Sequence, residues 1–270
     1  MSSLRFKFDT TATLLHFVTV ILAITNGSFV RSFPGACLTL MELVAFVFHI
    51  LYLTCYRGTP SVPRKIKWVE YGISATLGTI AVLHTNTRIR YDWIFLFLLI
   101  GTGQQLLGLL VDAKYELGFD TLWPAFIAGC CIQLGEYIFV AYAGDNYMNS
   151  VYWTYVAFYG LFGVHAFVGF WRKGSTDYME EIYSFYGFVA KLAVFYAEYF
   201  YFAGVSSIAI GSFATGMYLL TILFTIMIVL ANHNTSCVTP TSKDPHFFIR
   251  LYLTDQTRVY DEGRCQQLTP

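Results

Sequence analysis

The chain has 270 residues, of which 56% are hydrophobic and 13% are charged. A soluble domain carries about 25% charged residues, so this chain lacks much of the charge that would keep it in water. Seventeen basic residues balance seventeen acidic ones, which argues against nucleic acid as a partner. The composition therefore predicts an all-α, polytopic membrane protein whose main partner is membrane lipid.

Eight apolar segments follow one another along the chain, each close to the roughly 20 residues that cross a bilayer as a helix. Stretches with turn-forming or charged residues separate them, for example YRGTPSVPRKIK and DAKYELGFD. The weakest break is GVSSIAIGS, which carries no charge and lies between the seventh and eighth segments. The predicted spans are about residues 10–30, 36–56, 66–86, 91–111, 122–143, 149–171, 182–204 and 209–232.

The segments predict three parts of the chain. Residues 1–205 would form a seven-helix domain, residues 206–233 an additional transmembrane helix, and residues 234–270 a cytoplasmic tail. Cytoplasmic loops carry an excess of Lys and Arg. With the N-terminus in the cytoplasm, the outer loops hold only Arg31, Arg88 and Arg90, and the other basic residues between spans lie inside. We therefore expect a multi-pass protein with a cytoplasmic N-terminus.

Several ionisable side chains lie within the predicted spans. Each charged group at bilayer depth costs at least about 2.5–3.5 kcal/mol on insertion scales, so it indicates a functional or paired site. Such groups form the usual proton relays of membrane proteins. The residues concerned are Glu42, Glu70, Glu136, Lys191 and Glu198, with His16, His49 and His165.

Lys191 lies in the middle of the seventh span, in SFYGFVAKLAVFYAEYFYF. One interpretation is a structural ion pair with Glu198, two helical turns away on the same face. The other is a lysine that condenses with an aldehyde, because desolvation favours the neutral, nucleophilic amine. The protonated imine would then need a carboxylate nearby. Glu70, in RKIKWVEYGISATLG, is the candidate, although it also suits a glutamate near the aqueous boundary.

The depths of these two residues differ in the sequence. Lys191 lies about ten residues beyond Glu181, so it is expected to be deeper in the membrane than Glu70. Helical side chains lean toward the N-terminus of their helix. This direction reduces the expected difference in depth between the Lys191 amine and Glu70 but does not remove it.

WVEY in the third span and FVAK in the seventh together resemble heliorhodopsins, retinal proteins whose N-terminus faces the cytoplasm. The resemblance covers about residues 5–205 and implies a rhodopsin-like seven-helix core. It implies all-trans-retinal as cofactor, with its Schiff base on Lys191 and Glu70 as counterion. It further implies that His16 and His49 line a polar cavity on the cytoplasmic side of the Schiff base. A homodimer and an unknown cytoplasmic signalling partner are also implied.

The chain departs from this family at Gly187, where the family commonly has serine one turn before the lysine. The eighth span and the tail have no counterpart in the seven-helix pattern. Glu42, Glu136 and Glu198 add carboxylates to the membrane interior. An aromatic content of 19% suits a polyene pocket, although aromatic residues are also common in ordinary membrane packing.

Further pocket positions follow from their spacing to the two central residues. Tyr71 lies beside the predicted counterion, and Phe188 and Phe195 flank the predicted retinal lysine by one turn. We expect these three side chains, together with Gly187, to contact the chromophore.

Three functions are compatible with these residues, and none of them is enzymatic or needs a metal. The first is a photoreceptor in which light isomerises retinal and drives a conformational change. The second is a light-activated proton transporter or channel that uses Glu42, Glu136 and Glu198. In it, Glu136 and Glu198 lie toward the outer face, and Glu42, His16 and His49 lie in the inner half or near the middle. The third is a structural protein that Lys191 and Glu198 hold together.

Overall fold

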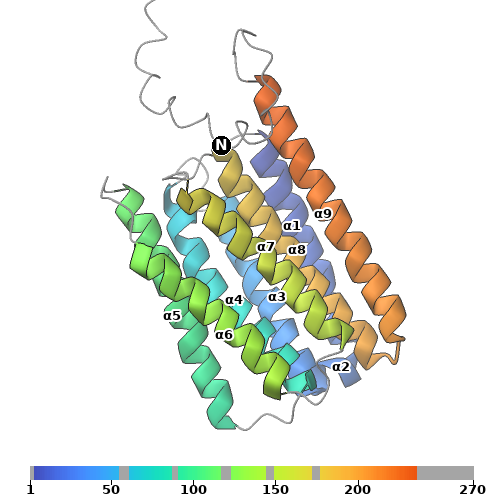
Figure 1. Ribbon diagram of the computed structural model, residues 1–270. Coiled ribbons are helices and arrows are strands. Elements are labelled where there is room, and N and C mark those ends of the chain that lie inside the picture. The colour runs from blue at the N-terminus through green and yellow to red at the C-terminus, as the bar shows by residue number, and fades with distance from the viewer. Residues whose placement is uncertain are drawn as a thin grey trace, which may run out of the picture.

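The computed structural model describes residues 3–54, 61–86, 91–116, 123–143, 149–171 and 177–235. Every regular element in these ranges is an α-helix, so the all-α prediction is confirmed for the described part of the chain (Figure 1). Most of the predicted tail, residues 236–270, lies outside the described residues. The helices are α1 (Ser3–Thr25), α2 (Gly27–Arg31), α3 (Phe33–Thr54), α4 (Ser61–Asn86), α5 (Tyr91–Glu116), α6 (Trp123–Ala143), α7 (Ser150–Trp171), α8 (Asp177–Phe202) and α9 (Ser207–Thr235).

Each of the eight predicted spans corresponds to one long helix of the described chain. Four of these helices contain segments long and apolar enough to cross a membrane, which supports a membrane protein. The number of spans and the orientation stay predictions. The four segments are Phe33–Thr54 in α3, Trp93–Leu110 in α5, Trp123–Tyr142 in α6 and Ser207–Leu230 in α9.

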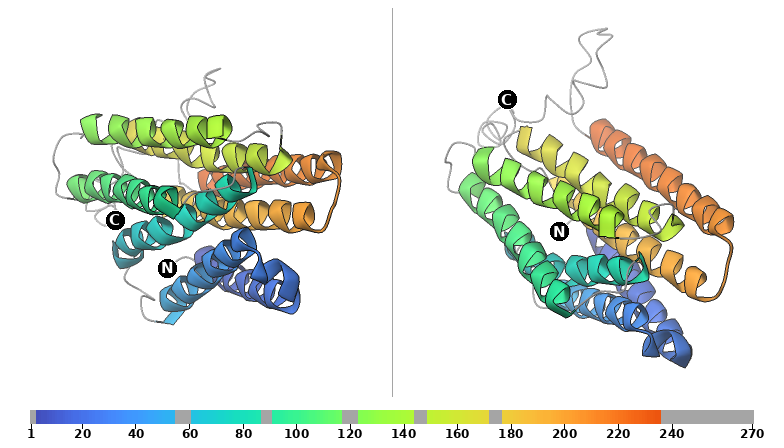
Figure 2. Two further views of the ribbon diagram at one scale, coloured as in Figure 1. Left: turned by 90° about the horizontal axis from the view of Figure 1, so that it is seen from below. Right: turned by 60° about the horizontal axis from the view of Figure 1, so that its bottom comes forward.

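Much of the exposed surface of the bundle is apolar, and α5, α6 and α9 carry a large part of it. Figures 1 and 2 show α5 and α6 along one edge and α9 along the other. Large apolar side chains point outward from them, among them Phe95 and Leu99 on α5 and Leu219 and Leu220 on α9. An apolar surface of this extent suits contact with lipid.

Helix α8 lies at the centre of the bundle, where it packs against α1, α3, α4, α7 and α9. Every residue from 186 to 195 is buried, so this part of α8 has no face open to solvent or lipid. The large apolar side chains that α8 exposes in the described chain are Tyr201 and Phe202, at its C-terminal end. A charged residue in the middle of α8 must therefore find its partners inside the protein.

The weak break between the seventh and eighth predicted spans is a defined helix end. Gly204 adopts a φ of 76°, a left-handed conformation that glycine reaches without a steric penalty. The Val205 amide donates to the Phe200 carbonyl at 2.9 Å, and the Gly204 amide donates to the Tyr201 carbonyl at 3.0 Å. These two bonds form a Schellman motif, which satisfies the last carbonyls of α8 and turns the chain into α9.

The link between α1 and α3 differs from the prediction. The first span was expected to continue to about residue 30, whereas α1 ends at Thr25 and the short helix α2 follows. The Asn26 side chain caps α2 by accepting a hydrogen bond from the Phe29 amide at 3.3 Å. Phe29 is fully buried against the rings of Phe195 and Tyr199. Aromatic packing thus fills the interior at the end of the bundle where α8 finishes.

We predict that Gly204→Ala lowers the free energy of unfolding by about 1 kcal/mol, because alanine is strained in a left-handed turn. Thermal unfolding of the detergent-solubilised protein measures this change. Gly211→Ala is the matched control, since Gly211 lies inside α9 with open space at its Cβ position, and alanine favours a helix. Equal stability of the two variants would contradict the role of Gly204 in ending α8.

Candidate functional site

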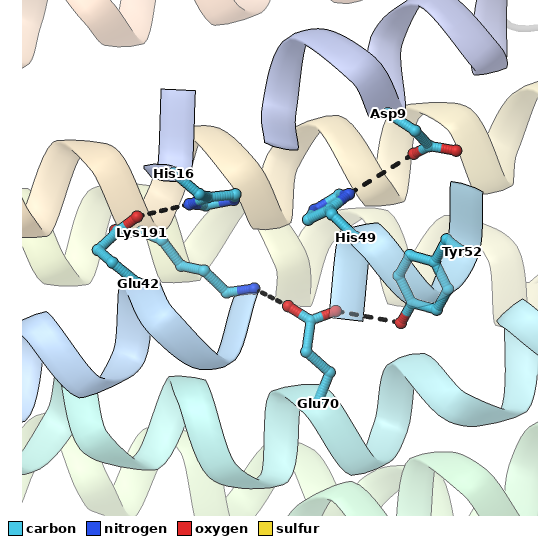
Figure 3. A network of polar contacts seen from close by, with 7 residues as sticks. All are labelled: Asp9, His16, Glu42, His49, Tyr52, Glu70 and Lys191. Carbon is cyan, nitrogen blue, oxygen red and sulfur yellow. Dashed lines mark hydrogen bonds and ion pairs between the residues drawn. The ribbon is translucent and has the colours of Figure 1, made fainter. Parts of the chain in front are cut away.

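A buried ion pair between α8 and α4 forms the centre of the candidate site (Figure 3). The Lys191 ammonium donates a hydrogen bond to Glu70 Oε1. The two residues are 3% and 2% exposed, so both charges are removed from solvent and lipid. Their mutual attraction is strong in such an interior, and the loss of either partner would leave an uncompensated charge.

The helix geometry explains how residues of different predicted depth meet. Lys191 is the fifteenth residue of α8 and Glu70 the tenth of α4, and both helices begin at the same end of the bundle. Five residues correspond to about 7 Å along a helix. The long lysine side chain leans toward the N-terminus of α8 and covers this difference.

Two tyrosines complete the surroundings of the ion pair. The Tyr52 hydroxyl on α3 donates to Glu70 Oε2 at 3.1 Å, so both carboxylate oxygens of Glu70 accept hydrogen bonds. The Lys191 nitrogen lies 4.8 Å from the centre of the Tyr71 ring, within the range of a cation–π contact. The ammonium is therefore stabilised by an anion and by an aromatic face.

Two histidine–carboxylate pairs join α1 to α3 beside the ion pair. His16 Nδ1 lies 2.5 Å from Glu42 Oε2, and His49 Nδ1 lies 3.7 Å from Asp9 Oδ1. The two imidazole rings stack with their centres 5.2 Å apart. All four residues are buried. Figure 3 shows them beside Tyr52 and the ion pair. His16 and Glu42 are within hydrogen-bond reach and can share a proton, whereas the His49–Asp9 contact is longer and purely electrostatic.

The register of α1 and α3 accounts for these pairs. His16 follows Asp9 by seven residues along α1, and Glu42 precedes His49 by seven residues along α3. Seven residues are close to two helical turns, so each helix presents its two polar groups on one face. The helices run antiparallel, and this spacing brings both pairs together at once.

Sequence reasoning missed Asp9 and Tyr52 as members of the site. A signal for Tyr52 was present, because it lies three residues after His49 on the same helical face. A signal for Asp9 was also present, because it lies seven residues before His16, on the same face of α1. Lys67 on α4 is a second buried lysine, with its nitrogen 4.6 Å from the centre of the Tyr183 ring.

The structure contradicts the alternative pairing of Lys191 with Glu198. The Thr85 hydroxyl donates to Glu198 Oε1, and no bond to Lys191 joins this carboxylate within the described ranges. The reason is that the Lys191 side chain leans toward the N-terminus of α8, away from Glu198. Glu136 also lies apart from the ion pair and accepts a hydrogen bond from Gln133 Nε2 at 3.3 Å.

The remaining predicted pocket residues divide between two faces of α8. Gly187 lies directly against the Tyr71 ring and therefore faces α4. The Phe188 ring contacts His16 at a centre-to-centre distance of 5.3 Å, and the Phe195 ring contacts Phe29 at 5.6 Å. These contacts place both phenylalanines toward α1 and α2. His165 is buried on α7, where its ring lies 5.6 Å from those of Tyr183 and Tyr186.

Comparisons of the chain with protein-family models, with curated proteins and with solved structures find no match. In the described part of the chain, no group of three or more His, Cys, Asp and Glu residues is arranged to hold a metal ion.

We predict that Glu70→Leu lowers the free energy of unfolding by about 3–5 kcal/mol, because it leaves the Lys191 charge buried without an anion. The double variant Glu70→Leu/Lys191→Leu is expected to recover most of that loss, since no unpaired charge remains. Unfolding in detergent measures both changes. Glu198→Gln is the control carboxylate, and combining it with Lys191→Leu should give additive effects. Additivity at Glu70 and Lys191 would contradict the ion pair.

Proposed function

We propose that this protein is a retinal-binding, light-responsive membrane protein, with retinal linked to Lys191 as a Schiff base and Glu70 as its counterion. The observation that carries the proposal is the buried ion pair of Lys191 and Glu70 at the centre of a helical bundle. The resemblance of WVEY and FVAK to heliorhodopsins supplies the identity of the aldehyde. A homodimer and a cytoplasmic signalling partner belong to the proposal through this resemblance alone.

The residues around Lys191 fit such a group. A primary amine is the required attachment point, and Glu70 provides the opposite charge within hydrogen-bond reach. The rings of Tyr71, Phe162 and Tyr183 contact one another on the α4 and α7 side of the amine. Flat aromatic walls with one polar end are typical of sites for elongated apolar ligands. Bound retinal would supply visible absorption and a double bond that isomerises in light.

The protein residues would then control the charge on the nitrogen. Glu70 stabilises the protonated state, and the hydrogen bond from Tyr52 holds the carboxylate in position. Tyr52 lies on α3, the helix that carries Glu42 and His49. A change in the charge or position of Glu70 would therefore act on α3 through this hydrogen bond. Because α8 also packs against five other helices, a displacement at Lys191 acts on most of the bundle. This arrangement supports a conformational output.

Proton transport through Glu42, Glu136 and Glu198 has less support. The described polar contacts join Glu42 to His16 but leave Glu136 with Gln133 and Glu198 with Thr85. A proton relay needs neighbouring groups within hydrogen-bond reach along the whole path. On the side of Lys191 where α8 ends, the fully buried side chains Phe29, Leu38, Ile80, Leu83 and Phe195 are apolar, and Glu198 is the buried carboxylate on α8 there. The photoreceptor is therefore the better-supported function.

We predict that the purified protein incubated with all-trans-retinal develops a visible absorption band that Lys191→Ala abolishes. The reason is that the imine forms only if the Lys191 amine is present, and the protonated imine of retinal absorbs visible light. Lys67→Ala is the matched control, because Lys67 is also a buried lysine beside aromatic rings. Absence of the band in the unmodified protein, or its survival in Lys191→Ala, would contradict the proposed function.

We predict that Glu70→Gln shifts the visible band to longer wavelength at unchanged pH, or removes the band because the imine loses its proton. An anion beside the nitrogen stabilises the positive charge most in the ground state, so its removal narrows the energy gap. Absorption spectra of the retinal-loaded proteins measure the shift. Glu198→Gln should leave the band in place, since Glu198 bonds to Thr85. An unmoved band in Glu70→Gln would remove Glu70 from the counterion role.

A further inference from the structure

The space beside Gly187, one helical turn before Lys191, is occupied by a side chain from another helix. A Cβ atom at Gly187 would overlap with Tyr71 Oη and would lie 3.0 Å from Cζ and 3.1 Å from Cε1 of the same ring. Real Cβ atoms essentially never approach another atom below 3.0 Å. The phenol ring of Tyr71 thus lies where any side chain at position 187 would have to go.

Other rings restrict how far Tyr71 can move. Its ring centre lies 5.7 Å from that of Phe162 on α7 and 5.6 Å from that of Tyr183 on α8. Tyr71 is buried, so the phenol has little open space to enter. A side chain at position 187 would therefore displace the ring against close-packed neighbours.

The position of this ring matters because its centre is 4.8 Å from the Lys191 nitrogen. An ammonium near an aromatic face is attracted by the negative charge density of the ring. The nitrogen is thus held by the Tyr71 ring in addition to the Glu70 carboxylate.

We propose that Gly187 and Tyr71 form a steric lock that keeps the Tyr71 ring against the Lys191 nitrogen, which makes Tyr71 a positioning residue for this amine. The proposal rests on the proposed function, in which the amine binds an aldehyde. It goes beyond that function by assigning to Tyr71 and Gly187 the positioning of the amine before any aldehyde binds.

The lock is tested on the retinal-free protein in detergent, with formaldehyde and cyanoborohydride as the reagents that methylate amines. Mass spectrometry of the peptide that contains Lys191 gives the methylation rate in four proteins: unmodified, Tyr71→Ala, Gly187→Ala and the double variant. Removing or displacing the ring weakens the hold on the ammonium, so each single variant should raise the rate roughly 2- to 30-fold. The double variant should react no faster than Tyr71→Ala.

Gly160→Ala is the matched glycine control, since Gly160 lies inside α7 with open space at its Cβ position. Its methylation rate at Lys191 should equal that of the unmodified protein. An unchanged methylation rate in Gly187→Ala overturns the lock. A double variant whose rate increase equals the product of the two single increases also overturns it, because the two substitutions would then act independently.

Melting temperatures decide the matter if Lys191 is not methylated in any of the four proteins. Gly187→Ala should lower the melting temperature of the unmodified protein but not that of Tyr71→Ala. An equal loss in both backgrounds overturns the lock. The methylation and melting experiments use no retinal. Failure of the lock would therefore not contradict the proposed retinal binding, and absence of the visible band would not contradict the lock.

Discussion

The protein is organised around the need to accommodate one charged lysine in the middle of its central helix. Lys191 lies in a stretch of α8 that other helices cover on all sides, so neither water nor lipid headgroups are within reach. An isolated charge in such surroundings would cost far more than a folded protein has to spare. Glu70 and the Tyr71 ring compensate it, and both come from α4. The contacts of Lys191 with these two residues therefore stabilise the packing of α4 against α8.

The polar groups on α1 and α3 follow from the same constraint. Burying Asp9, His16, Glu42 and His49 is tolerable because the antiparallel register pairs each histidine with a carboxylate. Tyr52 connects this seam to the ion pair by its hydrogen bond to Glu70. The site therefore joins four helices, α1, α3, α4 and α8, rather than one lysine and one acid.

The distribution of polarity along the bundle bears on its function. The histidine–carboxylate pairs and Tyr52 lie close to Lys191 and Glu70. Toward the end of α8, the packing of Phe29 and Phe195 surrounds few polar groups, and Glu198 there is bonded to Thr85. In the described part of the chain, the hydrogen bonds of the ion pair extend to Tyr52, and Glu198 and Glu136 form separate contacts with Thr85 and Gln133. A change at the central amine would therefore act first on the helices packed around α8.

The sequence by itself indicated the long helices and the central residue, because both depend on local properties, although it did not separate α2 from α1. Hydropathy over about 20 residues marked each long helix, and the cost of a charge at that depth singled out Lys191. It also indicated the end of α8, where glycine permits the left-handed turn at Gly204.

Only the tertiary structure decided which groups meet, because contacts between helices depend on how each helix is rotated and which helices are neighbours. Spacing along α8 allowed Glu198 as the partner of Lys191, yet the direction of the lysine side chain selects Glu70. The role of Asp9 depends on His49, which α3 places beside it. The fit of Tyr71 against Gly187 joins residues 116 positions apart, and no pattern within either helix contains it.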